Sequence, residues 1–562
     1  MLTGQRFVIS GLSRLTVRVA RELRARGGEV AVVASQPDPA LATLLEDTAL
    51  IESGPKREPA LLEAGLPEAT SLLALADDDL DNLAAAVAAH SAAPDIPVVL
   101  RAFDPSLIDA VGEGLNIRRA YSVSALAAPA FVAAAAGQEV VETLRLGDDE
   151  VPLCRMPVSA GSPLEGRSPA EIKREHACAV VARADRGGSW QPVTADDEPL
   201  RPDEQILAGG RLLDVLRLAL RNRDATISRA PGPAAPPHRA PRRRRRLRAP
   251  TTLLPMAALV LGLWLLATVA VFAVALDLNP IDAVYVAVTT ALGNSTVDDE
   301  AAWLKVFGVG SMVAGGALLG VLFSWLASVA TASRLDERMG RRARRLSDHA
   351  VIAGLGTAGF RTQQLLGELG VPVSVVERSA GNRFAEAVDP GVPVVIMDVR
   401  LPENLEQVGI DDAWCFVACT DDDLTNIGAC MQARRLHPGL RTVARIFDED
   451  LSERVAGAFG IDAAVSTTRA AAGAFVAAAI DERGPRTVRL GALELVAVRH
   501  TAPADVAPEL LAAWRAEGIR LLAFIRDGEV RPASTLAGPL QAGDTVVVAG
   551  PAEAVRTTLL DA

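Results

Sequence analysis

Several classes of functional site have no signature in this sequence. The 562 residues include six histidines and five cysteines, and neither type forms the HExxH pattern or the paired CxxC spacing of a zinc site. Scattered cysteines in an odd number are typical of small buried side chains in a reducing compartment. We therefore predict no metal site and no catalytic residue among them.

A secretory signal and an excess of positive charge are also missing. Residues Arg6–Ser10 already have the pattern of a β-strand, and no apolar run with a cleavage site precedes them. The N-terminal domain is therefore expected to stay in the cytoplasm. A net charge of −12, with an isoelectric point near 5.2, argues against a nucleic-acid partner.

Hydrophobic residues, in contrast, are abundant. They make up 50% of the chain, and the mean hydropathy of +0.24 is high for a purely soluble protein. The runs Leu253–Leu276 and Val306–Ser333 contain no charged residue, and each is long enough for the ~20 residues that span a bilayer. We predict an outer transmembrane helix at 251–277 and an inner one at 303–333. A buried helix of a soluble domain is the alternative for either run.

The charges that flank these runs predict their orientation. Arginines are concentrated before the first run, at Arg242–Arg246, and after the second, from Arg334 to Arg345, whereas the loop between the runs is mostly acidic. Positively charged flanks stay on the cytoplasmic side, so we expect a multi-pass protein of the cell membrane with both termini in the cytoplasm. Acidic residues on the outer side would concentrate cations at a pore mouth. These residues are Asp298, Asp299 and Glu300.

The loop itself contains a shorter apolar stretch, Ile281–Leu292, which has the length of a re-entrant segment. Asn279 and Pro280 before it are typical of a helix start. A helix re-entering from outside would direct its partially negative C-terminus toward the membrane centre, where it stabilises a cation. Residues 278–302 are therefore predicted to form a pore helix and filter. Close packing and a gating bend explain equally well the inner-run glycines Gly308, Gly310, Gly315, Gly316 and Gly320.

The regions on either side of this pore module repeat each other. Asp77-Asp-Asp-Leu-Asp-Asn82 corresponds to Asp421-Asp-Asp-Leu-Thr-Asn426, about 344 residues later. In each copy, apolar strands alternate with helical segments, which predicts a doubly wound parallel sheet followed by a small β-rich lobe. We call these parts the first and second α/β domains and the first and second C-terminal lobes. In the second domain we expect strands at Ala350–Ala353, Val373–Val376, Val392–Met397, Trp414–Ala418 and Thr442–Ile446, and a helix at Gly359–Leu369.

The second α/β domain carries a glycine pattern typical of a dinucleotide site. Gly354-x-Gly356-x-x-Gly359 lies between a predicted strand and a predicted helix. The glycines allow a tight turn and let a pyrophosphate approach the helix N-terminus. Glu377 ends the next strand, where an acid accepts hydrogen bonds from a ribose, and Asp398 ends the third, on the adenosine side. We predict NAD or another adenine nucleotide as the ligand; a fold that has lost its ligand is the alternative.

The first α/β domain departs from this pattern. Gly11 corresponds to Gly354, but Ser13 and Thr16 stand in place of the other two glycines, and Ala34 replaces the acid at the end of the second strand. We therefore predict a structural or partner-binding domain whose nucleotide site is lost or altered.

The residues of both copies resemble the RCK family, regulators of potassium conductance that are also described as TrkA-N and TrkA-C domains. The matching features are the second-domain glycines, Glu377, the segment Thr420–Asn426 and the segment Arg445–Asp448. The resemblance implies monovalent cations as the transported species, a homotetrameric pore in the lipid membrane, and a gating ring of eight RCK domains, two from each chain. The nucleotide-site residues expected from the glycine pattern and the resemblance are Gly354, Gly356, Thr357, Gly359, Glu377, Asp398 and Thr420.

The segment at the filter position departs from this family. Potassium filters have the sequence TVGYG, whereas this segment has a single glycine. Leu292 in a glycine's left-handed conformation would cost roughly 1–2 kcal/mol, so we expect a less potassium-selective cation pathway. A non-conducting membrane sensor or scaffold is the alternative. A membrane-bound NAD-dependent oxidoreductase is disfavoured because no substrate site accompanies the glycine loop, so we do not expect an enzyme. The expected filter residues are Thr289, Thr290, Ala291, Leu292, Gly293 and Asn294.

The predicted fold class is therefore α/β combined with membrane α-helices. Two Rossmann-like RCK domains, each with a small β-rich lobe, flank a two-helix pore module. The predicted segments are an N-lobe at 1–138, a C-lobe at 139–223, a linker at 224–250, the pore module at 251–277, 278–302 and 303–333, a linker at 334–347, an N-lobe at 348–485 and a C-lobe at 486–562.

Overall fold

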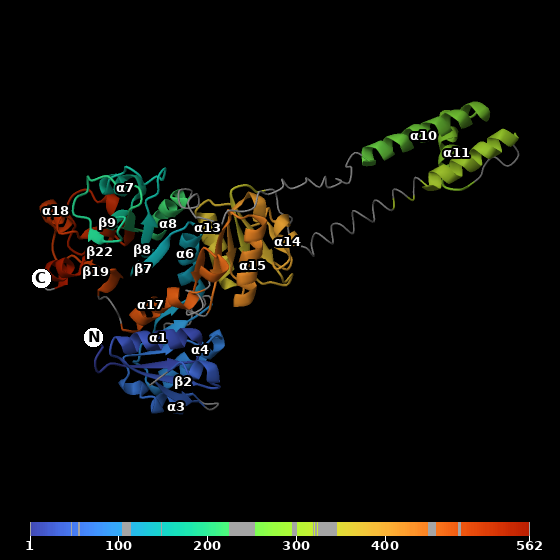
Figure 1. The fold of residues 1–562 in the computed structure, drawn as a ribbon. Helices are drawn as coiled ribbons and strands as arrows, with labels where there is room; N and C mark the ends of the chain where they lie inside the picture. Colours follow the sequence, from blue (N-terminus) through green and yellow to red (C-terminus); the bar gives the residue numbers. More distant parts are fainter. Residues whose placement is uncertain are drawn as a thin grey trace. The chain divides into compact units, whose positions relative to one another are not determined.

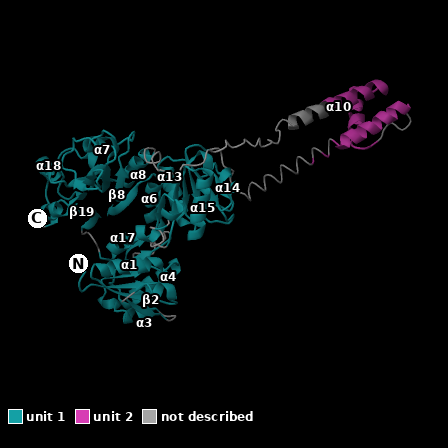
Figure 2. Ribbon diagram, in the orientation of Figure 1, with its two compact units in different colours: residues 1–233, 342–562 teal, residues 234–341 magenta. Residues whose placement is uncertain are grey.

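The computed structural model divides the chain into two compact units, residues 1–233 with 342–562, and residues 234–341 (Figure 2). The larger unit contains both α/β domains and both C-terminal lobes. The structure describes residues 2–45, 48–53, 57–103, 114–147, 149–223, 253–294, 301–317, 320, 323, 346–447, 454, 457–480 and 485–560.

Each α/β domain is built on a six-stranded parallel sheet (Figure 1). The strand order is β3-β2-β1-β4-β5-β6 in the first domain and β14-β13-β12-β15-β16-β17 in the second. The two orders are equivalent, and they are those of a doubly wound sheet, so this prediction is confirmed. The first sheet consists of β1 (Arg6–Ser10), β2 (Glu29–Ala34), β3 (Ala49–Glu52), β4 (Ser71–Ala74), β5 (Val98–Arg101) and β6 (Ile117–Tyr121); the second consists of β12 (His349–Ala353), β13 (Val373–Glu377), β14 (Val394–Ile396), β15 (Ala413–Ala418), β16 (Arg441–Arg445) and β17 (Ala463–Val465).

Helices cover both faces of the sheets, which explains why the central strands β1 and β12 are almost continuously apolar and buried. The helix after β12 begins at Thr357, two residues before its predicted start, because Gly356 is its N-cap. The short strand β17 was not predicted. The helices within the sheets' connections are α1 (Arg14–Ala25), α2 (Pro39–Ala42), α3 (Glu58–Glu63) and α4 (Asp79–Ala92) in the first domain, and α13 (Thr357–Glu368), α14 (Pro402–Gln407) and α15 (Asp423–Leu436) in the second.

The helix that follows the sixth strand of each domain packs on the other domain. The helix α6 (Val123–Ala135) lies on α13, and α17 (Thr467–Ala479) lies on α1 (Figure 1). Phe131 of α6 is buried in the core of the second domain, and Phe475 of α17 is buried in that of the first. The Phe475 ring meets Tyr121 edge to face, with centroids 5.4 Å apart. The two domains therefore complete each other's hydrophobic cores.

Arginines fix the C-terminal ends of these exchanged helices. Arg441 Nε donates to the Ala134 carbonyl at 2.7 Å, and Arg118 Nη1 donates to the Ala478 carbonyl at 3.1 Å. A cation at a helix C-terminus is favoured because the last carbonyls have no partner within the helix. Burial lowers the pKa of Arg441 from its usual value, although the guanidinium remains charged. The two domains thus hold each other at equivalent alanines, through arginines that stand at different positions, Arg118 on β6 and Arg441 on β16.

Each C-terminal lobe is a five-stranded antiparallel sheet, with the order β10-β9-β11-β8-β7 in the first lobe and β18-β19-β22-β20-β21 in the second. Leu153 and Leu207 of the first sheet share a core with Leu522 and Val547 of the second. The elements are β7 (Glu139–Leu146), β8 (Asp149–Pro157), α7 (Pro169–His176), β9 (Ala179–Ala184), β10 (Trp190–Pro192), β11 (Gln205–Gly209) and α8 (Leu212–Arg221), then β18 (Arg486–Leu490), β19 (Leu493–Thr501), α18 (Pro508–Ala516), β20 (Arg520–Arg526), β21 (Glu529–Pro532), β22 (Thr545–Pro551) and α19 (Ala552–Val555).

The smaller unit is helical where the structure describes it. It contains α10 (Leu253–Ala275) and α11 (Pro280–Ala291), and residues 302–317 are also helical. Phe272, Ala287 and Leu304 form a small core between these helices. Among the described residues, no helix has both the length and the hydropathy of a membrane span. The linker 224–250, residues 334–345 and most of the predicted inner helix after 317 lie outside the described residues.

All five cysteines are buried and unbridged, as expected from their spacing. Burial raises the pKa of the Cys154 and Cys419 thiols to about 12, so both stay protonated and behave as small apolar groups. In the described part of the chain, no group of three or more histidine, cysteine or acidic side chains is arranged to hold a metal ion.

Candidate nucleotide site

The glycine loop of the second α/β domain is shaped by two very close approaches. Gly354 follows β12 with a φ of +93°, and a Cβ there would lie 2.9 Å from the Thr420 backbone nitrogen. A Cβ on Gly359 would lie 2.0 Å from the Gly354 carbonyl oxygen. Neither position accepts a side chain without moving the backbone, so these glycines set the loop's path from strand to helix.

The middle glycine has a different role. Gly356 is the N-cap of α13 with an extended backbone (φ −73°, ψ −173°), and nothing lies within 4 Å of where a Cβ would be. It contributes no side-chain cap to the helix. No side chain therefore caps the first backbone N–H groups of α13, which lie at the positive end of the helix dipole. This is the arrangement that accommodates a phosphate.

Glu377 lies against this loop at the end of β13. Its Oε2 accepts a hydrogen bond from the Leu355 N–H at 2.7 Å, and its Oε1 accepts one from the Ser379 N–H at 2.9 Å. The acid is therefore held beside the central residue of the glycine loop, at the position where a ribose hydroxyl binds in dinucleotide folds. Asn382 closes the same corner by donating to the Leu355 carbonyl at 3.1 Å.

Asp398 is already engaged by its neighbour. Its carboxylate pairs with Arg400, with Nη2 2.6 Å from Oδ2 and Nε 3.0 Å from Oδ1. Hydrogen bonds from the Arg400 side chain and backbone lower the pKa of Asp398 to about 2, so it is ionised at neutral pH. Asn404 anchors the same residue by donating to its carbonyl at 2.7 Å. The structure thus gives Asp398 a local partner in the loop after β14.

Thr420 lies beneath the loop rather than in open space. Its methyl carbon would be 3.0 Å from a Cβ on Gly354. Its backbone N–H and its hydroxyl both donate to Asn426 Oδ1, at 2.9 and 2.7 Å. Of the predicted site residues, Gly354, Gly359 and Thr420 therefore shape the backbone, while Gly356 and Thr357 begin α13 and Glu377 is held beside the loop at Leu355.

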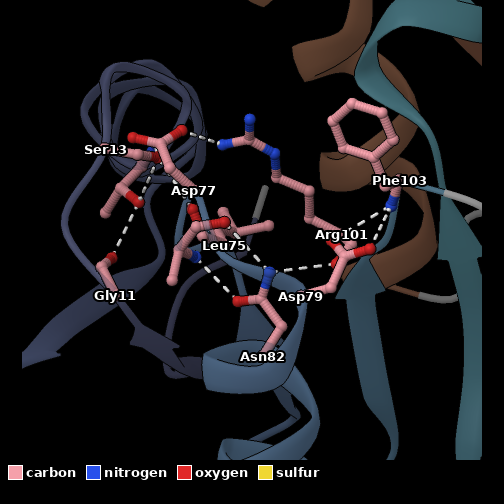
Figure 3. A network of polar contacts seen from close by, with 10 residues as sticks. Gly11, Ser13, Leu75, Asp77, Asp79, Asn82, Arg101 and Phe103 are labelled. Atoms are coloured by element: carbon pink, nitrogen blue, oxygen red, sulfur yellow. Dashed lines mark hydrogen bonds and ion pairs between the residues drawn. The ribbon is translucent and has the colours of Figure 1, made fainter. Parts of the chain in front are cut away.

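Asn426 belongs to a network that recurs in the first domain, where Figure 3 shows it. Asn82 Oδ1 accepts from the Ala76 N–H at 2.7 Å, and its Nδ2 donates to the carbonyls of Ala76 and Arg101. Asp79 accepts from the Phe103 N–H at 2.8 Å. Asn426 and Asp423 make the equivalent bonds in the second domain. The repeated Asp-Asp-Leu-x-Asn segment therefore joins the ends of the fourth and fifth strands in both copies.

The first domain fills the space that its counterpart leaves open. Ser13 caps α1: its Oγ accepts from the Thr16 N–H at 3.2 Å and donates to the Leu75 carbonyl at 2.8 Å. Thr16 Oγ1 donates to the Gly11 carbonyl at 2.8 Å. Ser13 and Thr16 are fully buried, and the labelled Ser13 points into the turn between Gly11 and Leu75 in Figure 3. Side-chain hydroxyls thus cap and fill this turn, whereas no side chain caps the equivalent helix of the second domain.

A cavity of about 360 Å³ lies where the two domains meet, and it reaches the N-termini of both helices. Arg14 and Thr357, the first residues of α1 and α13, both line it. Arg445 also lines it: burial lowers the pKa of this guanidinium, and its Nε has no hydrogen-bond partner among the described residues. The sequence did not predict this cavity, because it is formed only when the two copies pack together. Its other charged lining residues are Asp77, Arg101 and Asp421.

The first domain also has a cavity, of about 300 Å³, beside its own glycine loop. Gly11 and Ser53 line it together with Asp77, Asp78 and Asp81. Arg57 pairs with Asp81 there. The surplus of carboxylates makes this cavity a poor place for a phosphate, which agrees with the hydroxyl-filled turn above it.

Two stretches of the chain, residues 7–122 and 350–467, match the family model of the TrkA-N domain. They coincide with the two doubly wound sheets. Each α/β domain thus matches the TrkA-N model over nearly its whole sheet. The exchanged helices α6 and α17 lie largely after the matched stretches, and the C-terminal lobes lie wholly outside them.

Characterised and uncharacterised proteins share parts of this TrkA-N sequence. An uncharacterised protein of Methanothermus fervidus is 24% identical over 187 residues, which are 32% of this chain and 29% of the relative. A Trk system potassium uptake protein TrkA homolog of Pyrococcus horikoshii is 32% identical over 102 residues, which are 18% of this chain and 44% of the relative. The chain thus matches less than half the length of each of these relatives.

A solved structure described as the GsuK channel bound to NAD has the same fold. It aligns with 99% of this chain and 78% of its own length, with a TM-score of 0.51 and 16% sequence identity. At that identity the likeness concerns the arrangement of the elements.

The pore-like segment has the local structure that its sequence predicts for a helix start. Asn279 Oδ1 accepts from the N–H groups of Ile281 and Asp282, and α11 ends at Ala291. Leu292 keeps a right-handed backbone (φ −84°), and the left-handed residue is Gly293 (φ +92°). The strain considered for Leu292 is therefore not present. The predicted mouth residues Asp298, Asp299 and Glu300 lie outside the described residues.

One inner-run glycine has a packing role in the structure. A Cβ on Gly315 would lie 2.5 Å from the Ala291 carbonyl oxygen, at the end of α11. Gly310, Gly316 and Gly320 have nothing within 4 Å of such an atom. Close approach of two helices thus explains Gly315. It does not explain Gly310, Gly316 or Gly320, for which a gating bend stays a prediction.

Proposed function

We propose that this chain is the subunit of a nucleotide-regulated, potassium-channel-like cation channel whose two TrkA-N domains form the cytoplasmic sensor. The observation that carries the proposal is the N-terminus of α13 in the second α/β domain. It begins at Gly356 without a side-chain cap, and Glu377 is held beside the same loop, whereas the first domain caps its equivalent helix. Backbone N–H groups at a helix N-terminus bind phosphate oxygens, and Glu377 suits a ribose. NAD or another adenine nucleotide satisfies both.

The comparisons support the regulatory half of this proposal. A relative of the TrkA-N segments is named a potassium uptake protein, and a structure of the same fold is described as a channel bound to NAD. The uncharged runs, the arginine-rich flanks and the capped helix α11 support the pore half. We propose a location in the cell membrane, with cytoplasmic termini, and a homotetramer that assembles eight TrkA-N domains. We propose no reaction for the nucleotide, which acts as a ligand.

Arg14 extends the proposed site across the domain boundary. It belongs to the first domain but lines the cavity that also contains Thr357 at the start of α13. A guanidinium there would neutralise phosphate charge delivered to the second domain. The nucleotide would then be sensed by both copies, although only one of them offers an open helix N-terminus.

The decisive experiment measures binding and ion flux on the same full-length protein. Isothermal titration with NAD and with ADP should show saturable binding that Gly356→Asp abolishes, because the new carboxylate would face the phosphates. Gly428→Asp, at an exposed helical position with open space around it, is the matched control and should bind normally. In proteoliposomes, potassium or rubidium flux should change when nucleotide is added.

Two outcomes would redirect the proposal. Nucleotide binding without flux of any monovalent cation would support the second candidate, a non-conducting membrane sensor, which the single filter glycine favours. Equal binding by wild type and Gly356→Asp would remove the nucleotide site from the α13 N-terminus.

A further inference from the structure

The two C-terminal lobes enclose a small pocket in which positive charge exceeds negative charge. Its volume is about 210 Å³, and it is lined by α7 of the first lobe and by α18 and β20 of the second. Lys173, Arg515 and Arg520 line it, and Asp196 is the one carboxylate among the described lining residues. Neither the glycine pattern nor the TrkA-N match concerns these lobes.

Arg520 is the centre of this pocket. Only 4% of its surface is exposed. Its Nη2 donates to the Val193 carbonyl at 2.6 Å and lies 3.1 Å from Asp196 Oδ1. Its Nε and Nη1 have no hydrogen-bond partner among the described residues. A buried guanidinium N–H without an acceptor is costly. The two unpartnered donors of Arg520 therefore indicate an acceptor that the described part of the chain does not provide.

Two neighbours increase this demand for an acceptor. Burial, followed by the charge of Arg515, lowers the pKa of Lys173, which shows that the ammonium lacks full compensation. Trp514 is 6% exposed, and its Nε1 also has no partner in the described part of the chain. An anion would satisfy the donors and compensate the charges together.

We propose that this pocket binds the oxyanion group of a small metabolite, a carboxylate or a phosphate. The Nε and Nη1 atoms lie on different sides of the guanidinium, so each offers a separate charge-assisted donor to an oxygen of such a group. The volume is below the roughly 300 Å³ of a typical drug-sized site, so the pocket selects a small ligand or one end of a larger one. This ligand site is separate from the proposed nucleotide site.

The position of the pocket between the two C-terminal lobes means that a bound ligand would affect how firmly the lobes associate. Lys173 belongs to α7 of the first lobe, whereas Arg515 belongs to α18 and Arg520 to β20 of the second. A bound anion therefore contacts both lobes and stabilises their association. Ligand binding to the folded state raises its stability in proportion to the logarithm of the free ligand concentration.

The test uses the full-length protein without nucleotide, at constant ionic strength set with chloride. Inorganic phosphate and acetate are titrated separately by calorimetry, and the midpoint of thermal unfolding is followed at each concentration. Saturable binding of either probe is expected. Lys173→Gln and Arg515→Gln should each weaken it about tenfold, the loss of one charge-assisted contact. Arg489→Gln, an exposed arginine outside the pocket, is the control and should leave the affinity unchanged.

Further variants separate the alternatives. Gly356→Asp should retain anion binding, because Gly356 belongs to the second α/β domain whereas the pocket lies between the C-terminal lobes. Loss of anion binding in this variant would place the anion at the proposed nucleotide site instead. Arg520→Lys keeps the charge but removes the guanidinium with its Nε and Nη1 donors, so it should weaken binding while circular dichroism shows a folded protein. If Arg520→Lys does not fold, Lys173→Gln and Arg515→Gln still test whether the pocket binds the anion. Absence of saturable binding for both probes, or equal weakening in Arg489→Gln, would overturn the proposal.

Discussion

The two α/β domains agree in nearly everything that builds a fold and differ at the start of one helix. Both have the same strand order, a left-handed glycine after the first strand, and an asparagine that joins the fourth and fifth strands. In the second domain, Gly356 and Gly359 leave the α13 N-terminus open, whereas Ser13 and Thr16 cap and fill the equivalent turn in the first. A doubly wound sheet thus keeps its strand order with either kind of turn, because other residues hold the strands together.

The largest expected effect comes from giving the second domain the turn of the first. Gly356→Ser combined with Gly359→Thr should abolish nucleotide binding, because the new hydroxyl would cap α13 and the new Cβ would lie 2.0 Å from the Gly354 carbonyl. Overpacking of this kind costs about 1–3 kcal/mol of stability. Calorimetry measures the binding and thermal unfolding the stability.

The reverse exchange is its control. Ser13→Gly combined with Thr16→Gly removes the α1 side-chain cap, which costs roughly 0.3 kcal/mol when glycine takes the cap position. It should not create a tight nucleotide site, because Ala34 stands where Glu377 stands in the other domain. Tight binding by this variant's first domain would show that the glycines alone make the site.

The next effect should be equal in the two domains. Asn82→Ala and Asn426→Ala each remove a side chain that bonds one backbone N–H and two carbonyls. We expect each to lower the free energy of unfolding by about 2–3 kcal/mol, since buried backbone groups lose their partners. Chemical denaturation of the full-length protein measures both. A loss confined to Asn426→Ala would assign that segment to the ligand site rather than to the fold.

A smaller effect should cross the domain boundary. Arg14→Ala changes the first domain, yet we expect it to weaken nucleotide binding at the second about tenfold, because one charge-assisted contact is lost. Arg21→Ala, on the same helix but outside the shared cavity, is the matched control. Unchanged affinity in Arg14→Ala would confine the site to the second domain.

The smallest effect concerns Asp398, which has a local partner in Arg400. Its folded pKa of about 2 lies below the ~3.9 of an unfolded aspartate. The pair therefore stabilises the fold above about pH 4, and that contribution disappears as the pH falls toward 2. Asp398→Asn should remove this acid-range dependence and shift the unfolding midpoint only slightly, because the pair is solvent-screened. A large loss of nucleotide affinity in Asp398→Asn would show that the carboxylate leaves Arg400 for the ribose.

The alternation of apolar strands with turn residues was enough to predict both parallel sheets. The central strands β1 and β12 are buried on both faces, so their apolar pattern depends little on their neighbours. The glycine loop was equally predictable, since a left-handed turn and a carbonyl 2.0 Å from a Cβ position each demand glycine. The role of Asp398 was less predictable, because its pairing with Arg400 depends on the path of a loop rather than on a repeating pattern.

The sequence by itself therefore determined the doubly wound sheets, the repeat, and the change of the glycine pattern between the two copies. These properties depend on contacts between near neighbours or within one domain copy. Only the tertiary structure decided that α6 and α17 are exchanged and that Arg14 lines the cavity where the two domains meet. It also decided that Arg520 is buried with two N–H donors that have no partner among the described residues. Each of these depends on which surface of one copy meets the other. Apolar patterns show that a surface is covered but do not show by what, because hydrophobic burial has no direction.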